Sequence, residues 1–187
     1  MRAALSLLLV VVLLGACDTA DEPETTGLPA GSFEAEVEGY VSRSLAGEAV
    51  FDNLRGFEGP FFYLRMGVFG PGRPGERDVQ IVDIVDDEAG PPAPGVYTLP
   101  VIEGAERVTA GDLENETYSD SDVDGSSFKP TGGTVEIYAS DSTYVEGTFS
   151  FTAYDIVTTG PGTSERAEVS VSGAFHAVRG DTGIIVN

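Results

Sequence analysis

The chain has 187 residues, of which 31 are acidic and 10 basic, so its formal net charge at pH 7 is −21. A field this negative repels nucleic acids and anionic lipid surfaces, and we expect neither as a partner of the protein surface. A chain of this length is sufficient for one domain with a core of its own. With one histidine and one cysteine, it offers too few nitrogen and sulfur ligands for a zinc site.

Residues 1–16 predict a secretory signal peptide. Arg2 precedes an apolar run from Ala3 to Ala16, which is shorter than the ~20 residues of a membrane-spanning helix. The run ends in Leu14, Gly15, Ala16 and Cys17, which resembles the lipobox of bacterial lipoproteins. The resemblance implies that the Cys17 thiol is joined to diacylglycerol and that cleavage makes it the first residue. The alternative is an ordinary signal peptide with an incidental cysteine, which would leave an unpaired thiol where disulfides form.

Residues 17–32 predict a lipidated cysteine followed by a flexible acidic tether. The stretch after Cys17 has no apolar periodicity and is rich in Pro, Gly, Thr and acids, so residues 18–32 reach at most ~50 Å when extended. The sequence TADE at 19–22 resembles the acidic export signal that sends lipoproteins to the cell surface in some bacteria. A solvated linker explains the same residues.

From Phe33 onward, apolar and polar residues alternate with a period of two, which predicts β-strands. Gly and Pro clusters separate the strands, and no stretch has the pattern of an amphipathic helix. We expect one all-β domain over residues 33–187, an antiparallel, jelly-roll-like β-sandwich of about 8–9 strands. A small closed β-barrel is the alternative. Glycines on the inward face at 39, 147 and 173 predict a strongly curved sheet. The expected strands are 33–41, 46–51, 62–68, 79–85, 96–101, 135–139, 145–153 and 169–177.

The stretch from about 103 to 132 lacks a convincing strand and is expected to form a long acidic loop. Within it, Asp120, Asp122, Asp124 and Gly125 reproduce the first half of a calcium-binding loop, in which carboxylates at alternate positions converge on one cation. Ser126 follows as a further candidate ligand. The second half departs from the pattern, because Thr131 stands where the bidentate Glu is expected. Three alternating aspartates in a solvated acidic loop are the alternative interpretation.

The sequence offers little catalytic chemistry. His176 would have to be the general base of any Ser-His-Asp triad, and no nucleophile-elbow motif is present. Alternation places His176 opposite buried Phe175 and Ala177, as in a surface or structural histidine. Acid pairs could support glycoside hydrolysis, but a chain this acidic brings some pair together in any fold. The outward-register residues Tyr63, Tyr138 and Tyr154 could form a small binding patch or cover the sheet.

Four segments carry a resemblance to a known group of proteins: FEAEVEGYVSRSLAGEAVF at 33–51, GVYTL at 95–99, GTFSFTA at 147–153 and VSVSGAFHAV at 169–178. Together they resemble a group of uncharacterised lipoproteins common in the Bacteroidota and their relatives. The resemblance implies an extracytoplasmic all-β domain and no catalytic residue. We therefore expect a protein attached by its lipid to the outer membrane, at the periplasmic or surface face, that acts as a non-enzymatic binding or structural module. Its ligand would be an unidentified envelope, glycan or protein component. A small carboxylate-dependent hydrolase is the alternative.

Overall fold

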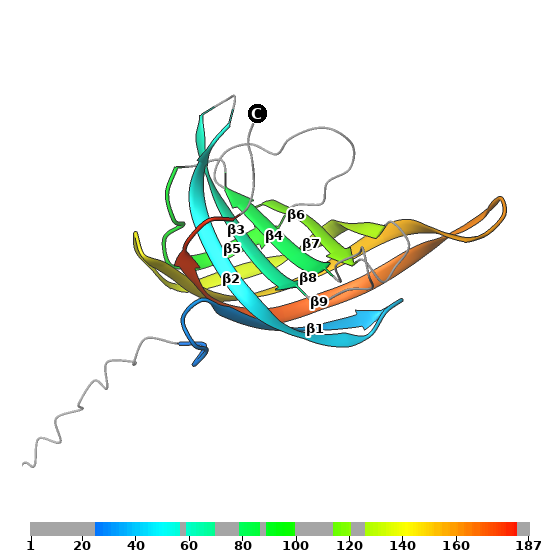
Figure 1. The fold of residues 1–187 in the computed structure, drawn as a ribbon, viewed down its shortest axis with the longest axis horizontal. Helices are drawn as coiled ribbons and strands as arrows, with labels where there is room; N and C mark the ends of the chain where they lie inside the picture. Colours follow the sequence, from blue (N-terminus) through cyan, green and yellow to red (C-terminus); the bar gives the residue numbers. More distant parts are fainter. Residues whose placement is uncertain are drawn as a thin grey trace, which may run out of the picture.

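The computed structural model describes residues 25–56, 59–69, 79–86, 89–99, 114–120 and 126–182. This part of the chain forms β-strands and no helix, which confirms the expected all-β class (Figure 1). No helix in the described ranges is long and apolar enough to cross a membrane. The strands are β1 (Ser32–Gly39), β2 (Arg43–Arg55), β3 (Pro60–Phe69), β4 (Val79–Asp86), β5 (Gly95–Leu99), β6 (Glu114–Asp120), β7 (Ser126–Ser140), β8 (Tyr144–Gly160) and β9 (Thr163–Arg179).

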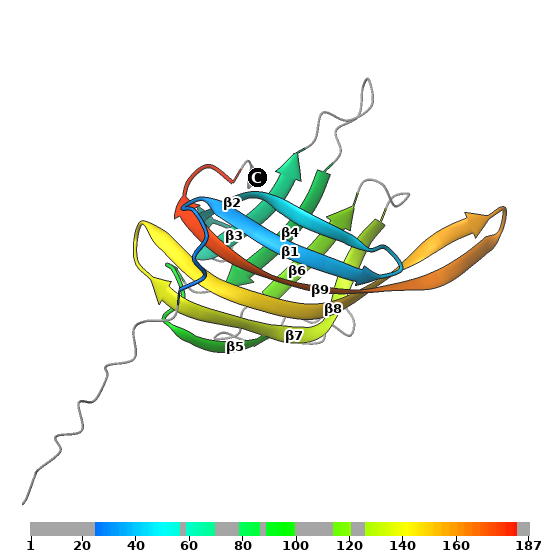
Figure 2. The ribbon, with the colours of Figure 1, turned by 90° about the horizontal axis from the view of Figure 1, so that it is seen from below.

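The nine described strands belong to one sheet with the order β5-β7-β6-β4-β3-β2-β1-β9-β8. Neighbouring strands pair antiparallel, as expected, and the one parallel contact joins Val50 and Phe51 of β2 to Val178 and Arg179 of β9. β7 contacts β5 and β6 along one edge and β8 along the other. The sheet is strongly curved in both views (Figures 1 and 2).

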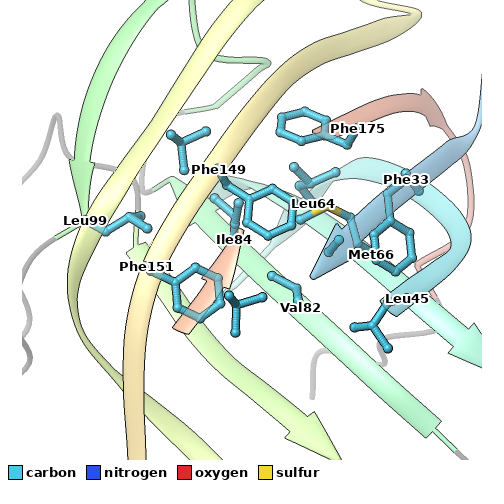
Figure 3. Packing of buried hydrophobic residues seen from close by; sticks show 14 of the residues in the cluster. Phe33, Leu45, Leu64, Met66, Val82, Ile84, Leu99, Phe149, Phe151 and Phe175 are labelled. Carbon is cyan, nitrogen blue, oxygen red and sulfur yellow. The ribbon is translucent and has the colours of Figure 1, made fainter. Parts of the chain in front are cut away.

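One apolar cluster fills the concave side of the sheet. Alternate residues of most strands point into it, so that Phe149 and Phe151 of β8 are buried while Ser150 between them is exposed. Phe149 also lies beside Phe175 of β9, with 6.3 Å between the ring centroids. Figure 3 shows how side chains from β1, β2, β3, β4, β5, β8 and β9 gather in one cluster. The labelled members are Phe33, Leu45, Leu64, Met66, Val82, Ile84, Leu99, Phe149, Phe151 and Phe175.

The structure differs from the sequence expectation between residues 103 and 132. Residues 114–120 form β6, and residues 126–132 are the first half of β7, so this stretch is not one long strandless loop. β6 has the sequence ENETYSD, which shows no apolar alternation. Its strand conformation comes from its neighbours, because it pairs with β4 on one side and β7 on the other.

The inward glycines allow neighbouring strands to approach closely. A Cβ atom on Gly147 would lie 2.1 Å from the carbonyl oxygen of Glu136, and one on Gly173 would lie 2.3 Å from that of Glu34. Neither space can hold a methyl group, since both obstacles are backbone atoms. Gly39, predicted as inward, is instead exposed at the end of β1, but a Cβ atom there would lie 2.5 Å from the carbonyl oxygen of Glu168, and its φ is 120°. The three glycines therefore occupy the positions of close approach that a strongly curved sheet requires.

We predict that Gly147→Ala lowers the free energy of unfolding by roughly 1–3 kcal/mol, the usual cost of overpacking a buried site. Gly160→Ala is the matched control, because Gly160 lies in the same strand and a Cβ there meets nothing within 4 Å. The control should change stability by less than ~0.5 kcal/mol. Urea unfolding of the two variants and the wild type measures the difference, and equal midpoints would show that the close approach at Gly147 is not a constraint.

Candidate functional site

The proposed lipid-attachment residues Leu14, Gly15, Ala16 and Cys17 lie outside the described residues, and the description begins at Thr25. The segment that follows, expected to belong to a tether up to residue 32, makes contacts with the sheet. The Thr26 amide and hydroxyl both donate to Oε1 of Glu146, at 2.6 and 2.7 Å. Five residues later, the Gly31 amide donates to the carbonyl of His176 at 2.7 Å.

Glu146 is buried, with 6% of its surface exposed, although it lies between Val145 and the inward Gly147 on the outward side of β8. A buried carboxylate is costly unless it accepts hydrogen bonds. Two of these bonds come from Thr26, which lies 120 residues away in the sequence. We name residues 26–32 the clasp. No sequence signal pointed to Glu146, because an outward glutamate in a strand is ordinarily solvated.

The candidate calcium residues are only partly described. Asp122 and Asp124 lie outside the described residues, and Asp120 and Ser126 are described for their backbone alone. Asp120 ends β6, Ser126 begins β7, and the two residues are opposite each other in the ladder. The motif is therefore the connection of a β6–β7 hairpin. No group of three acidic, histidine or cysteine side chains suited to a metal occurs among the described residues.

The outward side of β7, β8, β9 and β1 carries small hydroxyl groups beside a row of carboxylates. The ladder places Thr134, Ser150, Ser172 and Glu36 in one cross-strand row, and Thr152, Ser170 and Glu38 in the next. All these side chains are exposed. We name this surface the hydroxyl face, and its members are Thr134, Ser150, Thr152, Ser170, Ser172, Glu34, Glu36 and Glu38.

A shallow depression of about 270 Å³ lies at one end of the hydroxyl face, a volume just below the usual range of small-molecule sites. Glu38 and Glu168 contribute carboxylates to its lining, and Thr131, Thr152 and Ser170 contribute hydroxyls. The Thr131 and Thr152 hydroxyls are 2.7 Å apart and hydrogen-bonded to each other. The depression thus offers acceptors and hydroxyl groups to a small polar ligand.

His176 is half-buried on the outward side of β9, while Phe175 and Ala177 are fully buried, as the alternation predicts. Its ring lies against that of Tyr144, with 5.5 Å between centroids. In the ladder it is opposite Glu146 and Ser32, so it lies under the clasp. His176 therefore lies at the structural contact between the clasp and the sheet.

The three candidate tyrosines do not form one patch. Tyr63 is buried in β3, Tyr138 in β7 bonds the Thr148 hydroxyl at 3.2 Å, and Tyr154 in β8 is covered by the guanidinium of Arg166. The guanidinium carbon of Arg166 lies 4.0 Å from the Tyr154 ring centroid. Their positions favour the interpretation that these rings cover the sheet.

A buried polar cluster on the outward side of β3 and β4 was not expected from the sequence. Arg65 donates from Nε to Asp83 Oδ1 at 3.0 Å, from Nη2 to the Tyr63 hydroxyl at 2.8 Å, and from Nη1 to the carbonyl of Thr182 at 2.9 Å. Burial, together with the nearby Asp83 carboxylate, raises the pKa of Tyr63 far above its ordinary value, so Tyr63 stays neutral. The available signal was the charged Asp83 between apolar Val82 and Ile84.

Searches against protein-family models, curated proteins and solved structures found no match to this chain. The functional argument therefore depends on the residues themselves. The structure brings the clasp, Glu146 and His176 together at one end of the sheet, and Glu38 and Glu168 together beside the hydroxyl face.

The turn between β7 and β8, close to Glu146, is organised by a charged side chain. Asp141 Oδ1 accepts from the Thr143 hydroxyl and amide, each at 2.6 Å, and from the Tyr144 amide at 3.1 Å. The Thr143 hydroxyl, followed by its amide, holds the pKa of Asp141 below its ordinary value of 3.8. The stability that the charged form contributes is therefore complete above that value and is lost as the pH falls through the folded-state pKa.

We predict that Asp141→Ala lowers the urea midpoint at pH 7, and that its difference from the wild type narrows as the pH is lowered below the folded-state pKa. Asp141→Asn is the matched variant, because it keeps an acceptor at Oδ1 and removes only the charge. Urea titrations at several pH values measure the lowered midpoint at pH 7 and the narrowing of the difference at low pH. A difference between wild type and Asp141→Ala that stays constant with pH would contradict the role of the carboxylate.

Proposed function

We propose that this chain is a lipoprotein of the bacterial cell envelope, anchored to the outer membrane through acylated Cys17, whose domain acts as a non-enzymatic binding or structural module. The signal peptide, the lipobox-like residues 14–17 and the absence of a second cysteine support the anchor. Thr26 contacts the sheet only nine residues after Cys17, so the domain would lie within ~30 Å of the attached lipid. The resemblance to uncharacterised Bacteroidota lipoproteins is part of this proposal.

The observation that supports a ligand site on the outward side is the filled interior of the sheet. Phe51, Phe128 and Phe175, with 0% exposure, are among the side chains that occupy the concave side, where related architectures can hold a ligand. Binding is thereby left to the outward side. There the hydroxyl face and its depression offer hydrogen-bonding groups suited to a polar envelope component, such as a glycan or a protein surface.

The hydrolase alternative would use the same depression, because two carboxylates, Glu38 and Glu168, line it. Turnover of a glycan panel by the purified protein, abolished in Glu38→Gln, would favour the hydrolase. Binding of a glycan without turnover, retained in Glu38→Gln and lost in Ser170→Arg, would favour the binding module.

For the finer form of the fold, we propose the small barrel rather than the sandwich. The pairings support it, since each strand from β8 through β9, β1, β2, β3, β4 and β6 leads to the next and β6 leads to β7, which also pairs with β8. A sandwich would instead keep two sheets whose inward faces pack against each other. The three close approaches at Gly39, Gly147 and Gly173 fit the tighter curvature of a barrel.

We predict that the wild-type protein expressed with its signal sequence fractionates with membranes and requires detergent for release. Intact-mass measurement should find acyl groups on Cys17 as the first residue. Cys17→Ser should abolish both the acyl mass and the membrane association, because durable attachment depends on buried acyl chains. Thr25→Ser, in the tether, is the control and should change neither. A wild-type protein with an unmodified thiol would overturn the anchor.

A further inference from the structure

The clasp crosses two strands at one end of the sheet. β1 begins at Ser32, which is opposite His176 of β9, and the clasp continues from there to Glu146 of β8, the ladder partner of His176. Figure 2 shows this blue segment crossing the ends of β9 and β8. The Ser32 hydroxyl donates to the carbonyl of Pro29 at 2.6 Å, and the carbonyl of Gly31 accepts from the Ala49 amide at 2.9 Å. Residues 26–32 are therefore bonded to β2, β8 and β9.

The opposite end of β8 and β9 extends away from the clasp as a hairpin. Residues 155–167, which we name the arm, pair only with each other among the described strands. Figure 1 shows the orange arm at the opposite side of the molecule from the blue clasp. Between His176, under the clasp, and Thr163, at the start of β9, there are thirteen residue steps, which span about 40 Å in an extended strand.

We propose that the clasp biases the orientation of the domain on the bilayer, so that the β7–β8 turn lies nearer the membrane than the arm does. This inference rests on the proposed lipid anchor at Cys17. Without the clasp, the chain between Cys17 and Ser32 would be a linker with a reach of ~50 Å. This exceeds the roughly 40 Å from His176 to Thr163 and would leave the orientation of the domain free. With the clasp, the nine residue steps from Cys17 to Thr26 span at most ~30 Å and end beside Glu146, at one defined end of the sheet.

The buried carboxylate gives the clasp its strength. The Thr26 amide and hydroxyl both donate to Oε1 of Glu146. Hydrogen bonds to a charged group are roughly twice as strong as bonds between neutral groups. Opening the clasp would also expose the outward side of β8 and β9 at Glu146 and His176. The closed arrangement is thus held by two charge-assisted bonds, which offset the cost of burying Glu146, and by the backbone bond from Gly31 to His176.

Fluorescence transfer from the protein to labelled lipid tests this orientation. Because acylation uses the one natural cysteine, an introduced cysteine is a unique labelling site in the mature lipoprotein. Ser142→Cys labels the β7–β8 turn and Ser164→Cys labels the arm; both side chains are exposed. In vesicles of neutral phosphatidylcholine carrying an acceptor lipid, we expect stronger transfer from position 142 than from position 164. Equal transfer from the two positions would overturn the proposal.

Two variants test whether the difference in transfer depends on the bonds between Thr26 and Glu146. Glu146→Ala removes the acceptor, and Thr26→Pro removes both donors without altering the sheet, so the test holds even where Glu146→Ala unfolds. Each should abolish the difference in transfer between the two labels. Glu34→Ala is the matched control, because Glu34 is an exposed glutamate of β1, and it should preserve the difference. A difference that persists in Thr26→Pro would overturn the role of the clasp.

Hydrogen exchange distinguishes failure of the clasp from failure of the anchor. In the wild type, the amides of Thr26 and Gly31, which donate to Glu146 and His176, should be protected whether or not Cys17 is acylated. Glu146→Ala should speed exchange at Thr26 by roughly tenfold or more, the loss expected for a bond to a carboxylate. Unprotected wild-type amides would overturn the clasp alone. A wild type that does not bind the vesicles would overturn the proposed anchor and the orientation with it.

Discussion

Close contact between neighbouring backbones on the concave side of the sheet is the constraint on which the structure depends. At Gly147 and Gly173 the next strand passes so near that its carbonyl oxygen occupies the place of a Cβ atom. Such close approaches let the sheet bend sharply enough to enclose Phe149, Phe151 and Phe175 in one cluster. The enclosed side is consequently filled with phenyl and aliphatic groups, and the polar side chains of the same strands must point outward.

That division determines what the outward side can do. Where the outward side is open to water, it carries small hydroxyls and glutamates, as on the hydroxyl face. Where a chain end folds over it, polar groups become buried and need partners. Glu146 accepts hydrogen bonds from Thr26, near the N-terminal end of the described chain. Arg65 donates to the carbonyl of Thr182, near the C-terminal end of the described chain. In the same C-terminal segment, the Gly180 amide donates to the carbonyl of Phe51 at 3.0 Å.

The sequence predicted those strands in which the alternation of apolar and polar residues matches the inward and outward directions of their side chains. Alternation identified eight of the strands, including Phe149 and Phe151 as inward and His176 as outward, and the glycines indicated curvature. β6 was missed because its conformation is imposed by β4 and β7 rather than by its own residues. The composition of the clasp, which includes Gly27, Pro29 and Gly31, is typical of a flexible linker. What holds it is a glutamate 120 residues away, and no local pattern reports such a contact.

The coverings at the two chain ends lie at the same end of the sheet. β9 ends at Arg179, whose amide bonds the carbonyl of Thr143 in the β7–β8 turn, and the clasp crosses this strand only a few residues earlier, at His176. This end is therefore occupied by the chain's own segments, which are bonded to β2, β3, β8 and β9. At the opposite end of β8 and β9, the arm carries the exposed Ile156, 57% accessible, next to the buried Val157. If Cys17 carries the proposed lipid, a domain attached at the clasp end would hold the arm on its far side, because the clasp and the arm lie at opposite ends of β8 and β9.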